Sequence, residues 1–335
     1  MRRFALQLRR LSHGAAPPRL RCVMMNAARL DYDSRIRFDS LTQAGWKEVL
    51  INKELPLPAE LIHALPPSVR LICEAGTGYN NIDLAACRAK GISVCNVPTY
   101  AREAMAHMAI TLVMALACSL VPQARALAAG NREYMTQCHL GALPHFELTG
   151  KTIGLIGGLG TIGQRVAAMC RALGMRVLVC DVLPAARDAG GELVSFDEML
   201  RRSDFVSVHC PLNAHTRGLV GAEALSKMKP SAYLVNTARG AIVDQAALVQ
   251  ALRAKRIAGA ALDVYGEGSA PPPPLPHDSP LYDLDNVILT PHIGWQRLES
   301  RQRVVDMCAE NIAKFARGEP MNIDMATGLP RVESS

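Results

Sequence analysis

Acidic residues and lysine are absent from the first 30 residues, which nevertheless contain seven arginines. Of the 37 lysines and arginines in the chain, 30 therefore lie after residue 30, where they are matched by 30 acidic residues. Nucleic-acid binding requires a basic face on the folded part of a protein, so this balance excludes that class of function.

The acid-free leader, residues 1–18, has the composition of an organellar transit peptide. It is rich in arginine and places Phe4, Leu8 and Leu11 on one face of a helix. We expect either a mitochondrial import signal or an ordinary tail on an otherwise cytoplasmic protein. Residues from about 20 onward belong to the fold, because the first predicted strand covers residues 20–25.

Paired cysteines are also lacking: the ten cysteines include no CxxC motif. Several of them, such as Cys73, Cys95 and Cys180, lie in or beside apolar runs. This spacing indicates buried free thiols in a reducing compartment and gives no reason to expect a metal site.

Formal charges are missing from residues 104–121. This run of eighteen residues is near the lower length limit for a helix that spans a membrane. His107, Thr111 and Ser119 interrupt its apolar character, and charged residues flank it. In a chain patterned throughout as α/β, we favour a buried helix that packs between domains or subunits, and no contact with a membrane.

What is present is an alternation of short apolar runs with helical stretches. Runs that are apolar throughout indicate strands buried on both faces, and therefore a parallel sheet. A weaker alternation comes first and suggests a second, smaller α/β domain, onto which a helix at 301–317 folds back. The predicted strands are 20–25, 48–51, 69–73 and 92–95, then 152–156, 176–180, 205–209, 233–236, 258–264 and 287–290.

A glycine-rich turn directly follows the predicted strand 152–156 and opens a helix over 162–173. In this GxGxxG pattern, Gly158 permits the tight turn, Gly160 lets the backbone approach a pyrophosphate, and Gly163 lets helix and strand pack closely. The amides of Thr161 and Ile162 then face the phosphates at the helix N-terminus.

The next strand ends at Asp181, 23 residues after Gly158. An acid in this position accepts hydrogen bonds from the ribose hydroxyls and repels a 2′-phosphate, which favours NAD over NADP. Strand, turn, helix and acid together predict a Rossmann-type NAD site. A glycine-rich turn with a surface Asp is the alternative.

Six stretches, in order, are similar to those of the D-isomer-specific 2-hydroxyacid dehydrogenases. The resemblance covers residues from about 20 to 322, and the TPHIGW run with the ESRQR that follows it (299–303) looks most like the glycerate dehydrogenase or hydroxypyruvate reductase branch. The stretches are GTGYNNIDLAACRAKGISVCNVP (76–98), GKTIGLIGGLGTIG (150–163), VHCPLNAHTRGLV (208–220), VNTARGAIVDQAAL (235–248), ALDVYGEG (261–268) and TPHIGW (290–295).

The resemblance implies a doubly wound Rossmann-type domain (104–295) inserted in a smaller flavodoxin-like α/β substrate domain (19–103 and 296–328). It also implies an active site in the cleft between the domains and a homodimer. The substrate is a small 2-keto or 2-hydroxy acid, such as glyoxylate or hydroxypyruvate.

Three residues carry the chemistry that the resemblance implies. Arg239 binds the substrate, a task that suits a guanidinium because it stays charged and offers forked donors to planar oxygens. His292 is the proton donor, since an ordinary histidine titrates at about pH 6.5. The family's catalytic glutamate falls five residues after Asp263 and before a proline; here Gly268 stands at that place, and we assign the role to Glu267, one residue earlier.

The remaining positions implied by the resemblance concern binding. A surface arginine, a core histidine and an inert thiol are the alternatives for Arg239, His292 and Cys210, and we take His107 as structural. Thr77 and Gly78 hold the substrate carboxylate through their backbone. Contacts with NAD are assigned to Gly158, Gly160, Thr161, Ile162, Gly163, Asp181, Cys210, Pro211, Thr237, Ala238, Asp263 and Gly294.

A second class of function remains open, because some relatives bind NAD(H) as corepressors with little catalysis. The displaced Glu267 motivates this alternative, while the retention of Arg239 and His292 favours an enzyme. Oxidation of formate or phosphite by the same fold is a third, weaker option.

Overall fold

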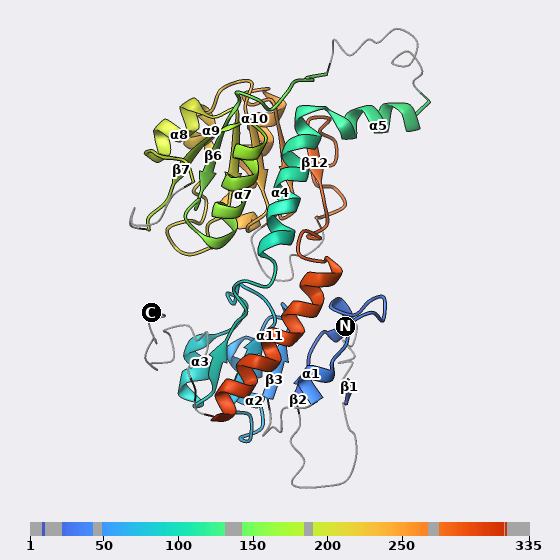
Figure 1. Cartoon of the computed structure of the whole chain (residues 1–335), viewed down its shortest axis with the longest axis vertical. Coiled ribbons are helices and arrows are strands. Elements are labelled where there is room, and N and C mark those ends of the chain that lie inside the picture. Colours follow the sequence, from blue (N-terminus) through green and yellow to red (C-terminus); the bar gives the residue numbers. More distant parts are fainter. Residues whose placement is uncertain are drawn as a thin grey trace. The chain divides into compact units, whose positions relative to one another are not determined.

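A computed structural model of the chain describes residues 9–10, 22–42, 49–130, 143–183, 190–266, 275–317 and 319. The chain divides into two compact units (Figure 1). Unit 1 comprises Met1–Ala101, Ser269–Pro271 and Trp295–Ser335, and unit 2 comprises Arg102–Gly268 and Pro272–Gly294. Apart from strand β1 (Arg9–Arg10), the predicted leader lies outside the described residues.

Unit 2 contains a seven-stranded sheet in the order β12-β11-β10-β9-β6-β7-β8, in which every pairing is parallel. The chain starts in the middle, at β6, moves to one side through β7 and β8, and then to the other through β9. This is the doubly wound order predicted from the sequence. The strands are β6 (Thr152–Ile156), β7 (Arg176–Cys180), β8 (Glu192–Leu193), β9 (Phe205–Val208), β10 (Tyr233–Asn236), β11 (Gly259–Leu262) and β12 (Val287–Leu289).

Both faces of this sheet are buried at its central strands, which explains why these strands are mostly apolar. Tyr233 and Val235 of β10 pack in one hydrophobic cluster with α4 and α7, whereas Leu234 packs in the opposite cluster with α8, α9 and α10. The helices are α4 (Arg102–Ala117), α7 (Thr161–Ala172), α8 (Phe196–Arg202), α9 (Ala222–Lys227), α10 (Gln245–Arg253) and the short η3 (Gly240–Ile242).

The apolar segment predicted as one buried helix is two helices, α4 and α5 (Leu120–Ala128), which meet at an angle of 65°. The break falls at Ser119, whose φ of 48° lies in the left-handed region. Ten residues of α4 are buried, as predicted, but none of α5 is. Among the described residues, no single helix is long and apolar enough to cross a membrane, although this bent pair passes by length and composition.

Unit 1 contains a five-stranded sheet whose strands lie in chain order, parallel except for β1. Helices α2 and α3 pack on one face, and α11 contacts β4 and α1, so the C-terminal helix folds back onto this sheet as predicted. The elements are β2 (Cys22–Met24), η1 (Ala27–Arg29), α1 (Asp39–Thr42), β3 (Val49–Asn52), α2 (Ala59–Ala64), β4 (Leu71–Glu74), α3 (Leu84–Ala89), β5 (Ser93–Cys95) and α11 (Leu298–Arg317).

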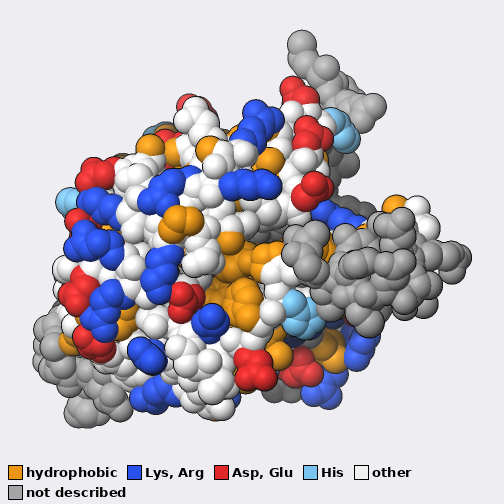
Figure 2. Space-filling view, turned by 90° about the horizontal axis from the view of Figure 1, so that it is seen from above, with side chains coloured by type: hydrophobic (Ala, Val, Ile, Leu, Met, Phe, Trp, Pro, Cys, Tyr) orange, Lys and Arg blue, Asp and Glu red, His pale blue; other side chains and the backbone are white. Residues whose placement is uncertain are grey.

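The surface carries a mixture of charges. On the face shown in Figure 2, Lys and Arg side chains alternate with Asp and Glu side chains, and hydrophobic side chains reach the surface between them. This mixture agrees with the near balance of charge after residue 30.

Candidate active site

The carboxyl edge of the unit 2 sheet collects the side chains that the sequence singled out. In a parallel sheet every strand ends at the same edge, and binding sites form where the strand order reverses. Here that point lies between β6 and β9. The glycine turn follows β6, Asp181 follows β7, Cys210 follows β9, Arg239 follows β10, Asp263 follows β11 and His292 follows β12.

The glycine turn needs its glycines for close backbone approach. Gly157, one residue before the predicted motif, adopts a φ of 80°, and a β-carbon there would lie 2.7 Å from the backbone nitrogen of Cys210. A β-carbon on Gly163 would lie 2.5 Å from the carbonyl oxygen of Gly157. Gly158 instead faces Val179 of β7, at 2.8 Å from the same hypothetical atom. The tight turn therefore depends on Gly157, and Gly158 and Gly163 allow close packing.

This geometry fits a dinucleotide pyrophosphate. Helix α7 begins at Thr161, and its N-cap, Gly160, has no side chain that could cap the first backbone N–H groups. A helix N-terminus with free N–H groups and a positive dipole end is an anion site, and the absent side chain lets a phosphate approach the backbone.

Asp181 lies beside the turn in a position that fits a ribose. Its carboxylate accepts hydrogen bonds from the backbone N–H of Leu159 at 2.8 Å and of Leu183 at 3.0 Å. These two bonds fix the carboxylate against the glycine turn. A carboxylate offers about four acceptor positions, so it retains capacity for ribose hydroxyls. Its negative charge favours NAD, as the sequence predicts.

The loop after β9 contributes groups that stay neutral. Burial lowers the pKa of His209 to about 4, and its Nε2 lies 2.9 Å from the hydroxyl of Ser207. Burial, followed by the negative charge of Asp181, raises the pKa of Cys210 to about 11. At neutral pH His209 is uncharged and Cys210 is a thiol, so neither suits proton transfer or nucleophilic attack.

Arg239 stands on a turn that its own backbone contacts define. The amide of Asn236, which is fully buried, accepts from Ala238 N–H at 3.0 Å and donates to the carbonyl of Arg239 at 2.9 Å. Gly240 lies so close to Tyr265 that a β-carbon would meet its carbonyl carbon at 2.4 Å. The guanidinium is half-buried and donates to Ala238 O at 2.8 Å.

His292 occupies a strained turn held by Asp263. Its φ of 54° lies in the left-handed region, which a histidine adopts at a cost of about 1 kcal/mol or more. The fully buried carboxylate of Asp263 accepts from the hydroxyl of Thr290 (2.6 Å) and from the backbone N–H of Ile293 (3.0 Å) and Gly294 (2.9 Å). Asp263 thus positions the turn that carries His292, which sequence reasoning did not foresee.

The predicted carboxylate loop, Thr77 and Gly78, belongs to unit 1 and follows β4. The carbonyl of Thr77 accepts from Asn96 Nδ2 at 2.7 Å, and that of Gly76 accepts from the N–H of Val97 at 3.0 Å. Thr77 is exposed and Gly78 is half-buried, so this loop reaches the surface of unit 1.

Most of the other predicted site residues lie among the described residues, and one does not. Thr237 is buried, Ala238 is half-buried and Pro211 is exposed, all beside the strand ends named above. Glu267 lies outside the described residues. Among the residues that the structure does describe, no group of His, Cys, Asp and Glu side chains could hold a metal ion.

Comparison with known proteins agrees with this arrangement. Residues 110–294 match the family described as "D-isomer specific 2-hydroxyacid dehydrogenase, NAD binding domain". Glycerate dehydrogenase of Methylorubrum extorquens is 37% identical over 83% of this chain and 85% of its own. Hydroxypyruvate reductase of Blautia hydrogenotrophica is 33% identical over 84% and 86%.

Solved structures show the same fold. A glyoxylate reductase from Paecilomyes thermophila superposes with a TM-score of 0.71 at 34% identity, covering 84% of each chain. The NAD-complexed D-isomer-specific 2-hydroxyacid dehydrogenase of Lactobacillus delbrueckii ssp. bulgaricus gives 0.68 at 29% identity, over 85% of this chain and 88% of its own. Sequence, glycine turn and fold lead to one conclusion. The chain belongs to the D-isomer-specific 2-hydroxyacid dehydrogenases and is an NAD-dependent oxidoreductase.

Proposed function

We propose that this protein reduces a small 2-keto acid, such as glyoxylate or hydroxypyruvate, with NADH. The observation that carries the proposal is the turn at the end of β10, where the buried Asn236 fixes an arginine at the carboxyl edge of the cofactor sheet. Relatives named as glycerate dehydrogenase, hydroxypyruvate reductase and glyoxylate reductase support this substrate class.

Each residue has a task that follows from its chemistry. Arg239 pairs with the substrate carboxylate and polarises the keto oxygen, because a guanidinium donates along two parallel directions. His292 gives a proton to that oxygen as it becomes a hydroxyl. Glu267 is the carboxylate to which the resemblance assigns the task of keeping the ring of His292 charged. When bound, NADH supplies the hydride that adds to the keto carbon.

A panel of 2-keto acids, assayed separately with NADH and NADPH, tests the proposal. We expect NADH to be consumed with glyoxylate or hydroxypyruvate, and NADPH to react at least about tenfold more slowly because Asp181 repels the 2′-phosphate. NADH binding without turnover across the panel would instead support the corepressor-like alternative.

We further propose that a second copy of the chain covers α5. None of its nine residues is buried, and Leu120 and Leu127 are 58% and 46% exposed. Met114, near the end of α4, is 48% exposed. Exposed large apolar side chains on one helix pair favour association with a like surface.

Light scattering after size-exclusion chromatography tests this assembly. The wild-type protein is expected to elute as a homodimer, and the double variant Leu120→Glu, Leu127→Glu as a monomer, since carboxylates oppose burial. Leu61→Glu, at a position in unit 1 that is 53% exposed, is the control that leaves the dimer intact. A wild-type monomer at micromolar concentration contradicts the proposal.

A further inference from the structure

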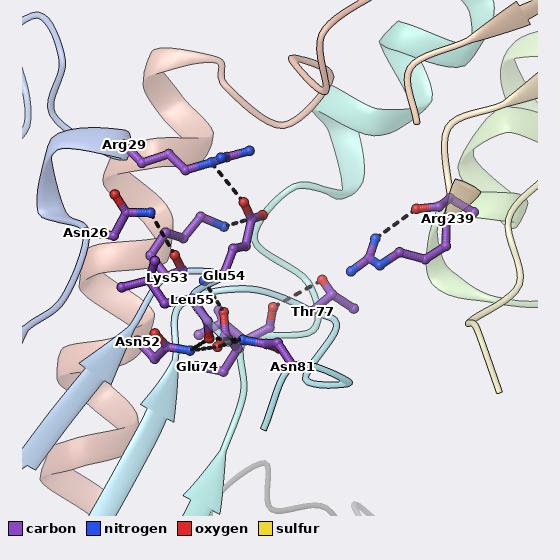
Figure 3. Close-up of polar contacts among 12 residues, drawn as sticks. Asn26, Arg29, Asn52, Lys53, Glu54, Leu55, Glu74, Thr77, Asn81 and Arg239 are labelled. Carbon is purple, nitrogen blue, oxygen red and sulfur yellow. Dashed lines mark hydrogen bonds and ion pairs between the residues drawn. The ribbon is translucent and has the colours of Figure 1, made fainter. Parts of the chain in front are cut away.

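A buried polar cluster lies beside the loop of unit 1 that carries Thr77 (Figure 3). At its centre, the fully buried carboxylate of Glu74 accepts three hydrogen bonds. The donors are Asn52 Nδ2 at 2.8 Å, Asn81 Nδ2 at 3.1 Å and the backbone N–H of Glu54 at 3.1 Å. Glu74 precedes the loop and Asn81 ends it, so their bond closes the base of the segment that carries Thr77 and Gly78.

A buried ammonium group completes this cluster. Lys53 is fully buried; its Nζ lies 3.0 Å from Glu54 Oε1 and 3.9 Å from the centre of the Trp295 ring. A β-carbon on Gly76 would lie 3.4 Å from both Lys53 Nζ and Glu74 Oε1. The ammonium group of Lys53 and the carboxylate of Glu74 therefore lie against Gly76, the residue before Thr77.

The charges in the cluster balance only when Glu74 is ionised. Arg29 Nε lies 2.9 Å from Glu54 Oε2, so the carboxylate of Glu54 is flanked by two cations, Arg29 and Lys53. An ionised Glu74 supplies the second negative charge. Cys308 of α11 is a further titratable group near Glu74; its hydrogen bond with Cys73, followed by burial, holds its pKa well above the ordinary thiol value.

We propose that the carboxylate of Glu74, supported by Lys53, positions the Thr77–Gly78 loop for substrate and releases it on protonation. This inference rests on the proposed function, which assigns that loop to the substrate carboxylate. Protonation removes the negative charge that strengthens these three hydrogen bonds and adds an O–H that needs an acceptor of its own, so all three bonds weaken. The bond to Asn81 is the one that fixes the far end of the loop.

The ionisation falls in the physiological range. Burial raises the pKa of Glu74 to about 7, against the opposing hydrogen bond from Asn81 and the charge of Lys53. Because the pKa of Glu74 is higher in the folded state than in the unfolded state, this carboxyl group stabilises the native state at pH values below its unfolded pKa of about 4.5. That contribution is lost as the pH rises to about 7. An ionised Glu74 is thus retained at a cost in stability, and a neutral Gln at this position should fold.

Steady-state kinetics of Glu74→Gln and Asn81→Ala test the proposal. In the wild type, the KM for hydroxypyruvate should rise about tenfold from about pH 8 to about pH 6, because ionised Glu74 falls by that factor. NADH affinity should change little, and kcat, which follows the protonation of His292, should not fall over this range. In Glu74→Gln the KM should be high at both pH values, and in Asn81→Ala it should be raised at pH 8. Glu60→Gln, at an exposed position in α2, is the control with the same charge change.

Amide hydrogen exchange of residues 75–81 provides a readout that needs no turnover. Protection of this loop should fall in the wild type at pH 6 and in Glu74→Gln at both pH values. Wild-type KM and protection in both variants would overturn the inference. Absence of turnover in the wild type would overturn the proposed function, whereas loop protection would still decide the role of Glu74.

Discussion

Arg239→Ala is expected to lower kcat/KM for hydroxypyruvate by about 10³ to 10⁴ while NADH still binds. The proposed contact between Arg239 and the substrate consists of two charge-assisted hydrogen bonds, each worth about 2 kcal/mol, and the variant would remove both. The turn itself should survive, because the buried Asn236 holds it through backbone atoms of Ala238 and Arg239. Steady-state kinetics and NADH fluorescence titration measure the two effects separately.

Two further variants make this result specific. Arg239→Lys keeps the charge but not the planar fork, so its loss should be smaller than that of Arg239→Ala. Arg253→Ala removes an exposed arginine from the last turn of α10 and should leave kinetics unchanged. Turnover left intact in Arg239→Ala would refute the assigned substrate contact.

His292→Asn is expected to lower kcat by about 10² to 10⁴, the range that general acid catalysis supplies. Asparagine is the informative replacement, because it tolerates the left-handed backbone that His292 adopts at a φ of 54°. The turn should therefore remain bound to Asp263 through the N–H groups of Ile293 and Gly294. NADH affinity should be unchanged.

The pH dependence of turnover provides the second test of His292. A histidine that donates a proton in keto acid reduction must be charged, so wild-type activity should fall as pH rises through the histidine pKa. The variant should lose this alkaline fall. His215→Asn, at an exposed position, serves as the control. A variant that retains wild-type kcat shows that another group donates the proton.

Much of unit 2 could be predicted because the sequence patterns that mark its strands and its glycine turn are local. Strands 152–156, 176–180 and 233–236 have the predicted bounds, since each has a short apolar stretch that is buried on both faces of the sheet. The GxGxxG motif predicted the tight turn at Gly158, whereas the structure has it one residue earlier, at Gly157. Gly157 takes that conformation because the backbone of Cys210, from a strand far along the chain, lies against it.

Contacts between distant residues could not be predicted. Nothing in the sequence near Asp263 indicates that its carboxylate holds the turn around His292; its predicted contact with the cofactor stays a prediction. Likewise, Lys53 and Glu74 are charged residues at the ends of apolar strands, a pattern typical of solvated positions. Only the fold shows that both are fully buried and hydrogen-bonded beside one loop. The break at Ser119 was missed because the apolar pattern continues through it.

The configuration of the product tests the central claim most directly. The protein is incubated with NADH and hydroxypyruvate, and the glycerate formed is resolved by chiral chromatography. An NADH-dependent reductase of this family, with Arg239 fixing the carboxylate and His292 donating the proton, should yield D-glycerate alone. L-glycerate, a mixture of both forms, or no glycerate despite bound NADH would contradict the account.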